Sequence, residues 1–202
     1  MSRPDKRNRL RIIAGRWRSR RLAFADTPGL RPTPDRVRET LFNWLQPVIA
    51  GARCLDLFAG SGALGFEAAS RGAAEVVLVE RDRAAVQCLR TQVANLDARG
   101  VQVVWADALS YLQQPGRPFD VVFLDPPYGS ELLGPCCERL EAGGWLSMPA
   151  HIYLETRIGQ NLPPLPPSWR RVRSQRAGQV NYHLAVRDAH RGPSVAIGAG
   201  QG

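Results

Sequence analysis

The chain has 202 residues, of which 44% are hydrophobic and 22% are charged, and its formal net charge is +9. This length fits one domain with a small appendage, and the composition is that of an ordinary globular protein. No apolar run approaches the roughly 20 residues of a membrane-spanning helix, and no apolar core follows the charged N-terminus as it would in a secretory signal. We therefore expect a cytoplasmic protein without a membrane partner.

The first predicted segment is a basic arm. Residues 1–21 hold nine of the 27 Lys and Arg side chains and one acid, which gives the segment a charge of +8, whereas the other 181 residues together carry +1. Such an arm suits a polyanion, because each neutralised phosphate releases condensed counterions. The RNA-binding candidates in the arm are Arg9, Arg11, Arg16, Trp17, Arg18, Arg20 and Arg21. Trp17 can either stack on a base or pack the arm.

Within the arm, residues 1–9 read as a disordered tail, and the run LRIIAGRWRSRRLAF reads as a β-hairpin with its arginines near the tip and on the second strand. We expect three parts: a tail and hairpin at 1–30, a main domain at 31–187 and a disordered tail at 188–202.

A helix is predicted to follow the hairpin. Thr33 can cap it, Pro34 fits its first position and Asp35 suits the positive end of its dipole. Helical spacing places one set of apolar residues on a single face, namely Val37, Leu41, Trp44, Leu45 and Val48. Pro47 should end the regular part of this helix.

Strands and helices then alternate. We predict strands near 53–57, 75–80, 101–105, 119–124 and 151–156, and helices near 62–71, 82–96, 107–113 and 130–141. A last pair of runs, WRRVRSQR and QVNYHLAVR, predicts a hairpin. The alternation indicates an α/β fold with a mostly parallel, doubly wound sheet.

The four cysteines give no sign of a metal site or a disulfide. Cys54, Cys88, Cys136 and Cys137 form no CxxC, and no His stands at ligand spacing beside them. We interpret them as small buried side chains in a reducing compartment and predict no metal.

The loop after the first sheet strand predicts a cofactor. Gly60, Gly62 and Gly65 fit G-x-G-x-x-G between a strand and a helix, where glycine lets the backbone approach a ligand. Asp56, at the end of that strand, would repel the pyrophosphate of NAD, but it can hold the ammonium group of S-adenosylmethionine (SAM), which has no phosphate.

Two further acids end the next strands. Glu80 can accept hydrogen bonds from both ribose hydroxyls of a nucleoside. Asp107 can accept from the adenine amino group, can cap the following helix, or can do both. The full set of SAM-binding candidates is Asp56, Phe58, Ala59, Gly60, Gly62, Glu80, Arg81, Asp107, Ala108 and Asp125.

The run VVFLDPPYG predicts the catalytic site, because Asp125, Pro126, Pro127 and Tyr128 follow the fourth sheet strand, at the edge where ligands of open α/β sheets bind. An exocyclic base amine is a poor nucleophile, since its lone pair is delocalised into the ring. The Asp125 carboxylate and the Pro126 carbonyl can each accept one of its N–H bonds and favour a nitrogen that attacks. Tyr128 can stack on a base taken out of its helix or loop.

These residues stand in a wider resemblance. DLFAGSGALGFEA and DPPY are typical of class I methyltransferases that methylate amino groups, and the chain from about residue 10 to 187 resembles the bacterial 16S rRNA guanine-N2 methyltransferase family called RsmD. The residues that carry the closer likeness are RIIAGRWRSRRLAF, LRPTPDRVRETLFNWL, GGWL, IYLETR and AGQVNYHL.

The resemblance implies a seven-stranded class I methyltransferase fold with a short N-terminal β-extension. It also implies SAM as donor and one guanine in the head of the small ribosomal subunit as acceptor, in assembled or assembling particles. Arg38, Glu39 and Asn43 match the family's helix before the first sheet strand, which we expect to cover the SAM or target pocket. We count Arg38 among the RNA-binding candidates and expect a monomer.

Two alternatives stay open at this point. The same tetrapeptide serves enzymes that methylate adenine N6 in DNA or rRNA, or a protein glutamine, although the basic arm disfavours a protein acceptor. The second alternative is a module that binds SAM or NAD without methyl transfer. A cytosine-C5 enzyme is disfavoured, because it needs a nucleophilic Cys where this chain has Asp125.

Overall fold

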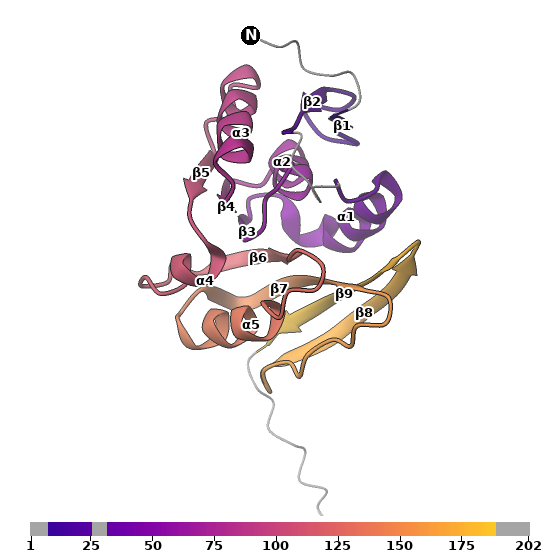
Figure 1. The fold of residues 1–202 in the computed structure, drawn as a ribbon, viewed down its shortest axis with the longest axis vertical. Helices are drawn as coiled ribbons and strands as arrows, with labels where there is room; N and C mark the ends of the chain where they lie inside the picture. The colour runs from indigo at the N-terminus through magenta and orange to yellow at the C-terminus, as the bar shows by residue number, and fades with distance from the viewer. Residues whose placement is uncertain (1–7, 26–31, 189–202) are drawn as a thin grey trace, which may run out of the picture.

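A seven-stranded sheet forms the centre of the molecule (Figure 1). The computed structural model describes residues 8–25 and 32–188, so the tails predicted at 1–9 and 188–202 lie almost wholly outside the described residues. The strands are β3 (Arg53–Asp56), β4 (Glu75–Glu80), β5 (Val101–Trp105), β6 (Phe119–Leu124), β7 (Leu146–Arg157), β8 (Trp169–Ala177) and β9 (Val180–Arg187).

The strand order is β5-β4-β3-β6-β7-β9-β8. The first five strands in this order are parallel, whereas β9 pairs antiparallel with both β7 and β8. The strand order reverses between β3 and β6, and the crevice beyond the carboxyl ends of strands at such a switch point is where ligands bind in these folds. The predicted class I fold is confirmed.

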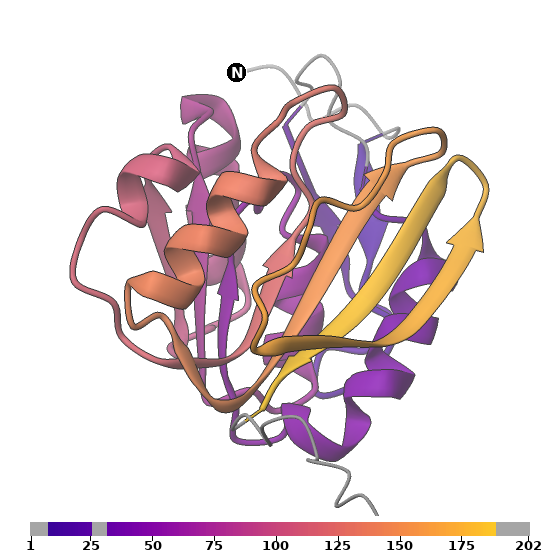
Figure 2. The same ribbon diagram turned by 90° about the horizontal axis from the view of Figure 1, so that it is seen from below.

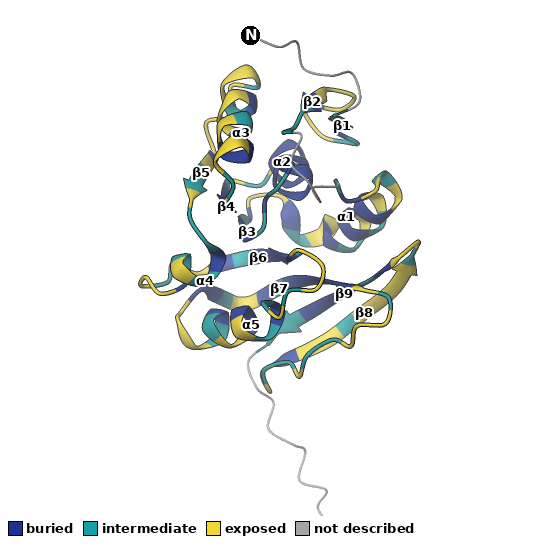
Figure 3. Ribbon diagram, viewed as in Figure 1, coloured by how far each residue is buried: buried dark blue, intermediate teal, exposed yellow. Residues whose placement is uncertain are grey.

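Helices cover both faces of the sheet. One face packs against α1 (Asp35–Ile49), α2 (Ala63–Ser70) and α3 (Arg83–Asn95), and the other against α4 (Ala108–Tyr111) and α5 (Leu133–Ala142). The central strands are buried on both sides, as their continuous apolar runs predict (Figure 3).

The N-terminal hairpin is confirmed, but it is more than an arm. β1 (Arg9–Arg11) pairs antiparallel with β2 (Arg21–Ala23), and the hairpin lies beside α2 and α3 (Figure 1). Leu10, Ile12, Trp17 and Leu22 are all buried in the same cluster as the sheet and α1 to α3. Folding of the hairpin therefore contributes apolar burial to the main core.

Several boundaries differ from the prediction. The N-cap of α1 is Pro34, with no side-chain cap hydrogen bond, so Thr33 does not cap this helix. Helix α1 continues through Pro47 to Ile49. Pro47 lies on the exposed face, where the carbonyl left without a helical partner can bind water, while Ile49 is buried and holds the last turn on the core. Strand β7 begins at Leu146, well before residue 151, because Leu146 pairs with Phe119 ahead of an irregularity in the register.

Three negative findings concern only residues 8–25 and 32–188. None of the helices there is long and apolar enough to cross a membrane. In the same residues no three His, Cys, Asp or Glu side chains gather as a metal site would require. Cys54, Cys136 and Cys137 are buried free thiols, and Cys88 is half-buried.

Candidate active site at the carboxyl edge of the sheet

The loop between β3 and α2 has the backbone that its glycines predict. Gly60 and Gly62 have φ values of +51° and +78°, in the left-handed region that favours glycine. A Cβ added to Gly65 would lie 2.1 Å from Cδ2 of Leu78, so the third glycine lets α2 pack closely on β4. The loop is thus a tight turn that leaves its backbone open to a ligand.

Asp56 ends β3 beneath this loop. Its Oδ2 accepts a hydrogen bond from the backbone N–H of Gly65 at 3.2 Å, and the residue is only 2% exposed. Burial raises the pKa of Asp56 to about 7, and the nearby charge of Glu80 adds to that rise, while hydrogen bonds from Gly65 and Phe58 oppose it. A cation beside this carboxylate would favour its ionised form.

The side chains of Glu80 and Asp107 both accept hydrogen bonds from backbone N–H groups at the same edge of the sheet. Glu80 accepts from the N–H of Gly60 at 2.8 Å and from that of Asp82 at 2.7 Å. Asp107 accepts from the N–H groups of Leu109 and Ser110 at 3.0 and 3.2 Å, which makes it the N-cap of α4. Capping is therefore present, and it leaves the second carboxylate oxygen of Asp107 open to a ligand.

The other cofactor candidates lie in the same two loops. Phe58 is half-buried and packs against the α5 side of the core, whereas Arg81 is exposed. Ala59 and Ala108 are buried.

Asp125 follows β6 at the switch point. Its Oδ2 accepts a hydrogen bond from the hydroxyl of Thr33 at 3.5 Å. Burial raises the pKa of Asp125 well above its ordinary value, and the charges of Glu155 and Asp56 add to the rise. Because a proton is held more tightly there than on an exposed carboxylate, Asp125 is suited to accept one.

Tyr128 stands on the surface but is tethered by its hydroxyl. The residue is 54% exposed, and its hydroxyl donates to Oε1 of Glu155 at 3.1 Å. Oε2 of the same glutamate accepts from the hydroxyl of Tyr153 at 2.7 Å. The ring is thereby available for stacking while its outer end is held in place.

The register explains why Glu155 lies beside Asp125. Leu124 of β6 pairs with Leu154 of β7, so Asp125 and Glu155 come next on adjacent parallel strands. Since side chains alternate along a strand, both point to the face opposite the two leucines. The edge therefore carries two neighbouring carboxyl groups, of which Glu155 is buried and Asp125 is half-buried.

A pocket of about 250 Å³ adjoins the turn at residues 125–128, the predicted catalytic turn. Its walls come from the turn itself, from the start of α5 and from the chain that follows β7, and they include Pro126, Pro127, Tyr128, Glu155, Thr156 and Asn161. The pocket is of a size to accept part of a nucleotide.

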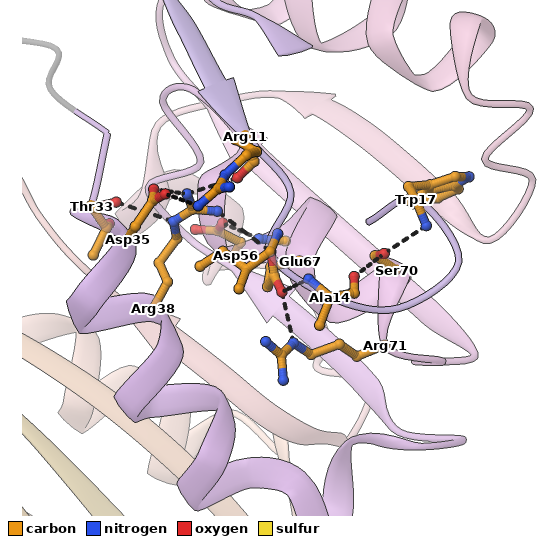
Figure 4. A network of polar contacts seen from close by, with 12 residues as sticks. Arg11, Ala14, Trp17, Thr33, Asp35, Arg38, Asp56, Glu67, Ser70 and Arg71 are labelled. Atoms are coloured by element: carbon orange, nitrogen blue, oxygen red, sulfur yellow. Dashed lines mark hydrogen bonds and ion pairs between the residues drawn. The ribbon is translucent and has the colours of Figure 1, made fainter. Parts of the chain in front are cut away.

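The hairpin is fixed to α2 by two side chains (Figure 4). Glu67 is fully buried, and its oxygens accept from the N–H of Ile13 at 2.8 Å and of Ala14 at 3.0 Å. The Ser70 hydroxyl donates to the Ala14 carbonyl at 2.6 Å and accepts from the N–H of Trp17 at 3.0 Å. The helix that follows the glycine loop thus carries the hairpin.

Arg38 extends this network to Asp35 and Thr33 (Figure 4). It pairs with Asp35 at 2.6 Å and with Glu67 at 3.5 Å, and its Nε donates to the carbonyl of Thr33 at 3.2 Å. The hydroxyl of Thr33 in turn contacts Asp125. Hairpin, α1, α2 and catalytic turn are therefore connected by polar contacts.

The comparisons with known proteins agree with this geometry. The family model described as "Conserved hypothetical protein 95" matches residues 10–186. Ribosomal RNA small subunit methyltransferase D of Escherichia coli K12 is 52% identical over 180 residues, which cover 89% of this chain and 91% of that protein. The chain belongs to the RsmD family.

A further relative and a solved structure are also similar to this chain. The Haemophilus influenzae protein of the same name is 43% identical and covers 90% of this chain and 95% of its own length. The solved structure of yhhF from Escherichia coli superposes with a TM-score of 0.85 at 49% identity, covering 90% of this chain and 99% of that one. The chain is a methyltransferase, like these RsmD relatives.

Two of the RNA-binding candidates are buried in this RsmD member. Trp17 is 7% exposed, belongs to the core and is covered by the Arg16 guanidinium 3.9 Å from its ring centre, so it packs the hairpin and offers no face to a base. Arg38 is 1% exposed and is occupied by Asp35 and Glu67. The remaining arm candidates are exposed, namely Arg9, Arg11, Arg16, Arg18, Arg20 and Arg21.

Sequence reasoning missed Glu67 and Glu155. Glu67 sits in a buried helix whose sequence, ALGFEAAS, gives no sign of what it meets 53 residues away. Glu155 did carry a signal, because it follows the apolar run IYL much as Glu80 follows VVLV. Glu39 and Asn43 of the family block are exposed, and α1 reaches the site through Thr33 instead.

Proposed function

We propose that this methyltransferase uses SAM to methylate the exocyclic N2 amine of one guanine in the 16S rRNA of the small ribosomal subunit. The observation that carries the proposal is the half-buried carboxyl group of Asp125, whose pKa is raised, at the switch point between the glycine loop and the exposed ring of Tyr128. The names of the relatives support rRNA of the small subunit as substrate. The choice of guanine N2 rests on the family resemblance.

The residues present fit SAM. Asp56 is a buried carboxylate without a cationic partner among the described residues, and it suits the ammonium group of the methionine end. Glu80 and Asp107 keep acceptor capacity for the ribose hydroxyls and the adenine amine. When bound, SAM supplies an electrophilic methyl group.

The chain's own residues prepare the acceptor. The Asp125 carboxylate accepts one N–H of the target amine and the Pro126 carbonyl accepts the other, which draws the nitrogen lone pair out of conjugation. Tyr128 stacks on the base, a contact worth about 1–3 kcal/mol. As the C–N bond forms, the methyl–sulfur bond of SAM would break and leave a neutral thioether. The nitrogen becomes positively charged and loses a proton, for which Asp125 is the acceptor. We further propose that the chain acts as a monomer, without a metal, in the cytoplasm.

The test is Asp125→Ala, with Glu138→Ala, which removes an exposed acid from α5, as the matched control. Small subunits from a strain that lacks the enzyme are incubated with labelled SAM, and the modified base is mapped by mass spectrometry. We expect the wild type and the control to label one guanine at N2. The Asp125 variant should lose at least about 100-fold in kcat while it still binds SAM.

Two results would contradict the proposal. Full turnover in the Asp125 variant would remove its catalytic role, and a methyl group mapped to adenine N6 would replace the acceptor.

A further inference from the structure

Residues 156–187 form a second basic region of the chain. They contain six arginines and no acid, a charge of +6 that the average over the chain outside the N-terminal arm conceals. Five of the six lie on β8 and β9, namely Arg170, Arg171, Arg173, Arg176 and Arg187. The average charge outside the arm suggested that the excess positive charge is confined to the arm. Residues 156–187 show that it is not.

Strand β8 presents its arginines to solvent. It is the edge strand of the sheet, and its four arginines are exposed. Arg170 pairs with Asp188, whereas Arg171, Arg173 and Arg176 make no ion pair within residues 8–25 and 32–188. Three guanidinium groups are thus free to meet an anion.

Two of the three lie on the α5 face of the sheet. Arg171 pairs with Ala185, which packs in the cluster that includes α5, and Arg176 pairs with Asn181. Residues paired across neighbouring strands share a face. Figure 2 shows α5 on this face over the centre of the sheet, while no helix lies over β8 and β9. We call Arg171, Ser174, Arg176, Asn181 and His183 the β8 basic face.

The β8 basic face is continuous with the pocket at the catalytic turn. Thr156 of β7 lines that pocket and pairs with Asn181 of β9. Asn181 in turn pairs with Arg176 of β8. Neighbouring strands are about 4.8 Å apart, so the backbone of Arg176 lies about 10 Å from that of Thr156 across the sheet. Thr156 is 6% exposed, and its hydroxyl is buried with no hydrogen-bond partner in the described part of the chain. A ligand in the pocket would supply one.

Charged side chains on an edge strand also prevent sheets from pairing edge to edge. That role is served by either sign of charge, and it does not account for an edge strand with four arginines and no acid. Single-signed charge is what a phosphate backbone requires.

We propose that the β8 basic face binds the phosphate backbone of the substrate RNA beside the target nucleotide. The inference rests on the proposed function and adds a second contact surface to it. In Figure 1 the hairpin and β8 lie at opposite ends of the molecule, so RNA bound to both would span the catalytic edge. The contacts are to phosphates, and they position the RNA without reading its sequence.

The test compares two double variants of equal charge. Arg171→Gln with Arg176→Gln removes two charges from the β8 basic face, and Arg90→Gln with Arg99→Gln removes two exposed charges from α3 and the loop after it. Affinity for small-subunit rRNA is measured from 50 to 200 mM salt. Each lost phosphate contact should flatten the slope of log affinity against log salt by about 0.7–0.9. We expect the β8 variant to lose one or two contacts and the control none.

Further measurements separate a phosphate contact from other effects of the substitutions. KM for RNA should rise in the β8 variant with kcat and SAM affinity unchanged, and Arg171→Lys with Arg176→Lys should restore the slope, because the contact is one of charge. Suppose that the wild type methylates rRNA, but the salt slope and KM of the β8 variant equal those of the α3 control. This result overturns the present inference and leaves the proposed function intact. Suppose instead that the wild type transfers no methyl group, but the salt slope of its RNA binding still depends on Arg171 and Arg176. This result contradicts the proposed function and supports RNA binding by the β8 basic face.

Discussion

At the scale of single residues, the site is decided by carboxyl groups placed out of water. Asp56 and Glu155 are buried and Asp125 is half-buried at one edge, and desolvation is the largest cause of the raised pKa of each. Without partners, such groups would cost the fold free energy in their ionised forms. Their retention at the switch point is consistent with groups kept for a ligand and a reaction.

Glu155 is a positioning residue in this scheme. Its carboxylate holds the hydroxyl of Tyr128, and its charge raises the pKa of Asp125. In Glu155→Gln that charge is gone, so the pKa of Asp125 should fall. Because Asp125 acts in its ionised form, the acid limb of the kcat profile should move to lower pH.

The same variant should bind RNA more weakly, since Tyr128 is less well held, while SAM binding is unchanged. Tyr128→Phe is the matched comparison: it removes the hydroxyl contact and leaves the charge, so it should raise KM for RNA without moving the acid limb. An acid limb at its original pH in Glu155→Gln would rule out the electrostatic coupling.

Asp56 predicts a pH dependence of cofactor binding. Its pKa is raised to about 7 in the absence of a cation, so a proton must leave before the carboxylate can hold the ammonium group of SAM. Affinity for SAM should therefore fall as pH drops below 7, approaching a tenfold loss per unit. Calorimetric titration between pH 5.5 and 7 would show this fall in the wild type.

Asp56→Asn provides the comparison, because its amide does not titrate. SAM affinity should be weaker in this variant and nearly constant over the same range. A wild-type affinity that is flat from pH 5.5 to 7 would argue against contact between Asp56 and the ammonium group.

At the scale of elements, α2 has two duties. Its N-terminal end receives the glycine loop, and its Glu67 and Ser70 carry the hairpin. One rigid helix therefore fixes the distance between the predicted RNA-binding arm and the cofactor loop.

Glu67→Gln tests this connection. It leaves Arg71 and Arg38 facing a neutral amide in a buried site, and breaking a buried ion pair costs about 3–5 kcal/mol in the free energy of unfolding. We expect a loss of that order in urea denaturation, with faster hydrogen exchange at the amides of Ile13 and Ala14. Glu39→Gln, an exposed acid on α1, should change stability by less than about 0.5 kcal/mol. Unchanged exchange at the two amides would show that the hairpin is held by its apolar contacts alone.

At the scale of the whole molecule, charge is segregated. Residues 22–155, which contain the cofactor loop and the catalytic turn, carry a net negative charge, whereas the N-terminal arm and residues 156–187 are strongly positive. This arrangement suits an enzyme that grips a polyanion on either side of a site whose own chemistry needs carboxylates.

The sequence by itself determined the sheet, the glycine loop and the catalytic turn. These depend on local patterns: continuous apolar runs for buried strands, glycines where φ is positive, and acids at strand ends. For the same reason the family could be assigned before any contact was seen.

Only the tertiary structure decided which polar groups meet. Trp17 and Arg38 looked like RNA ligands in a basic sequence but are buried, because the hairpin and α1 close over them. Glu155 joins Asp125, Glu67 meets Ile13, and Arg176 lines up with Thr156 through contacts between residues 20 to 54 positions apart in the chain. Such pairs are fixed by strand register and packing rather than by any local pattern, so the sequence contains the residues of the site without showing how they are joined.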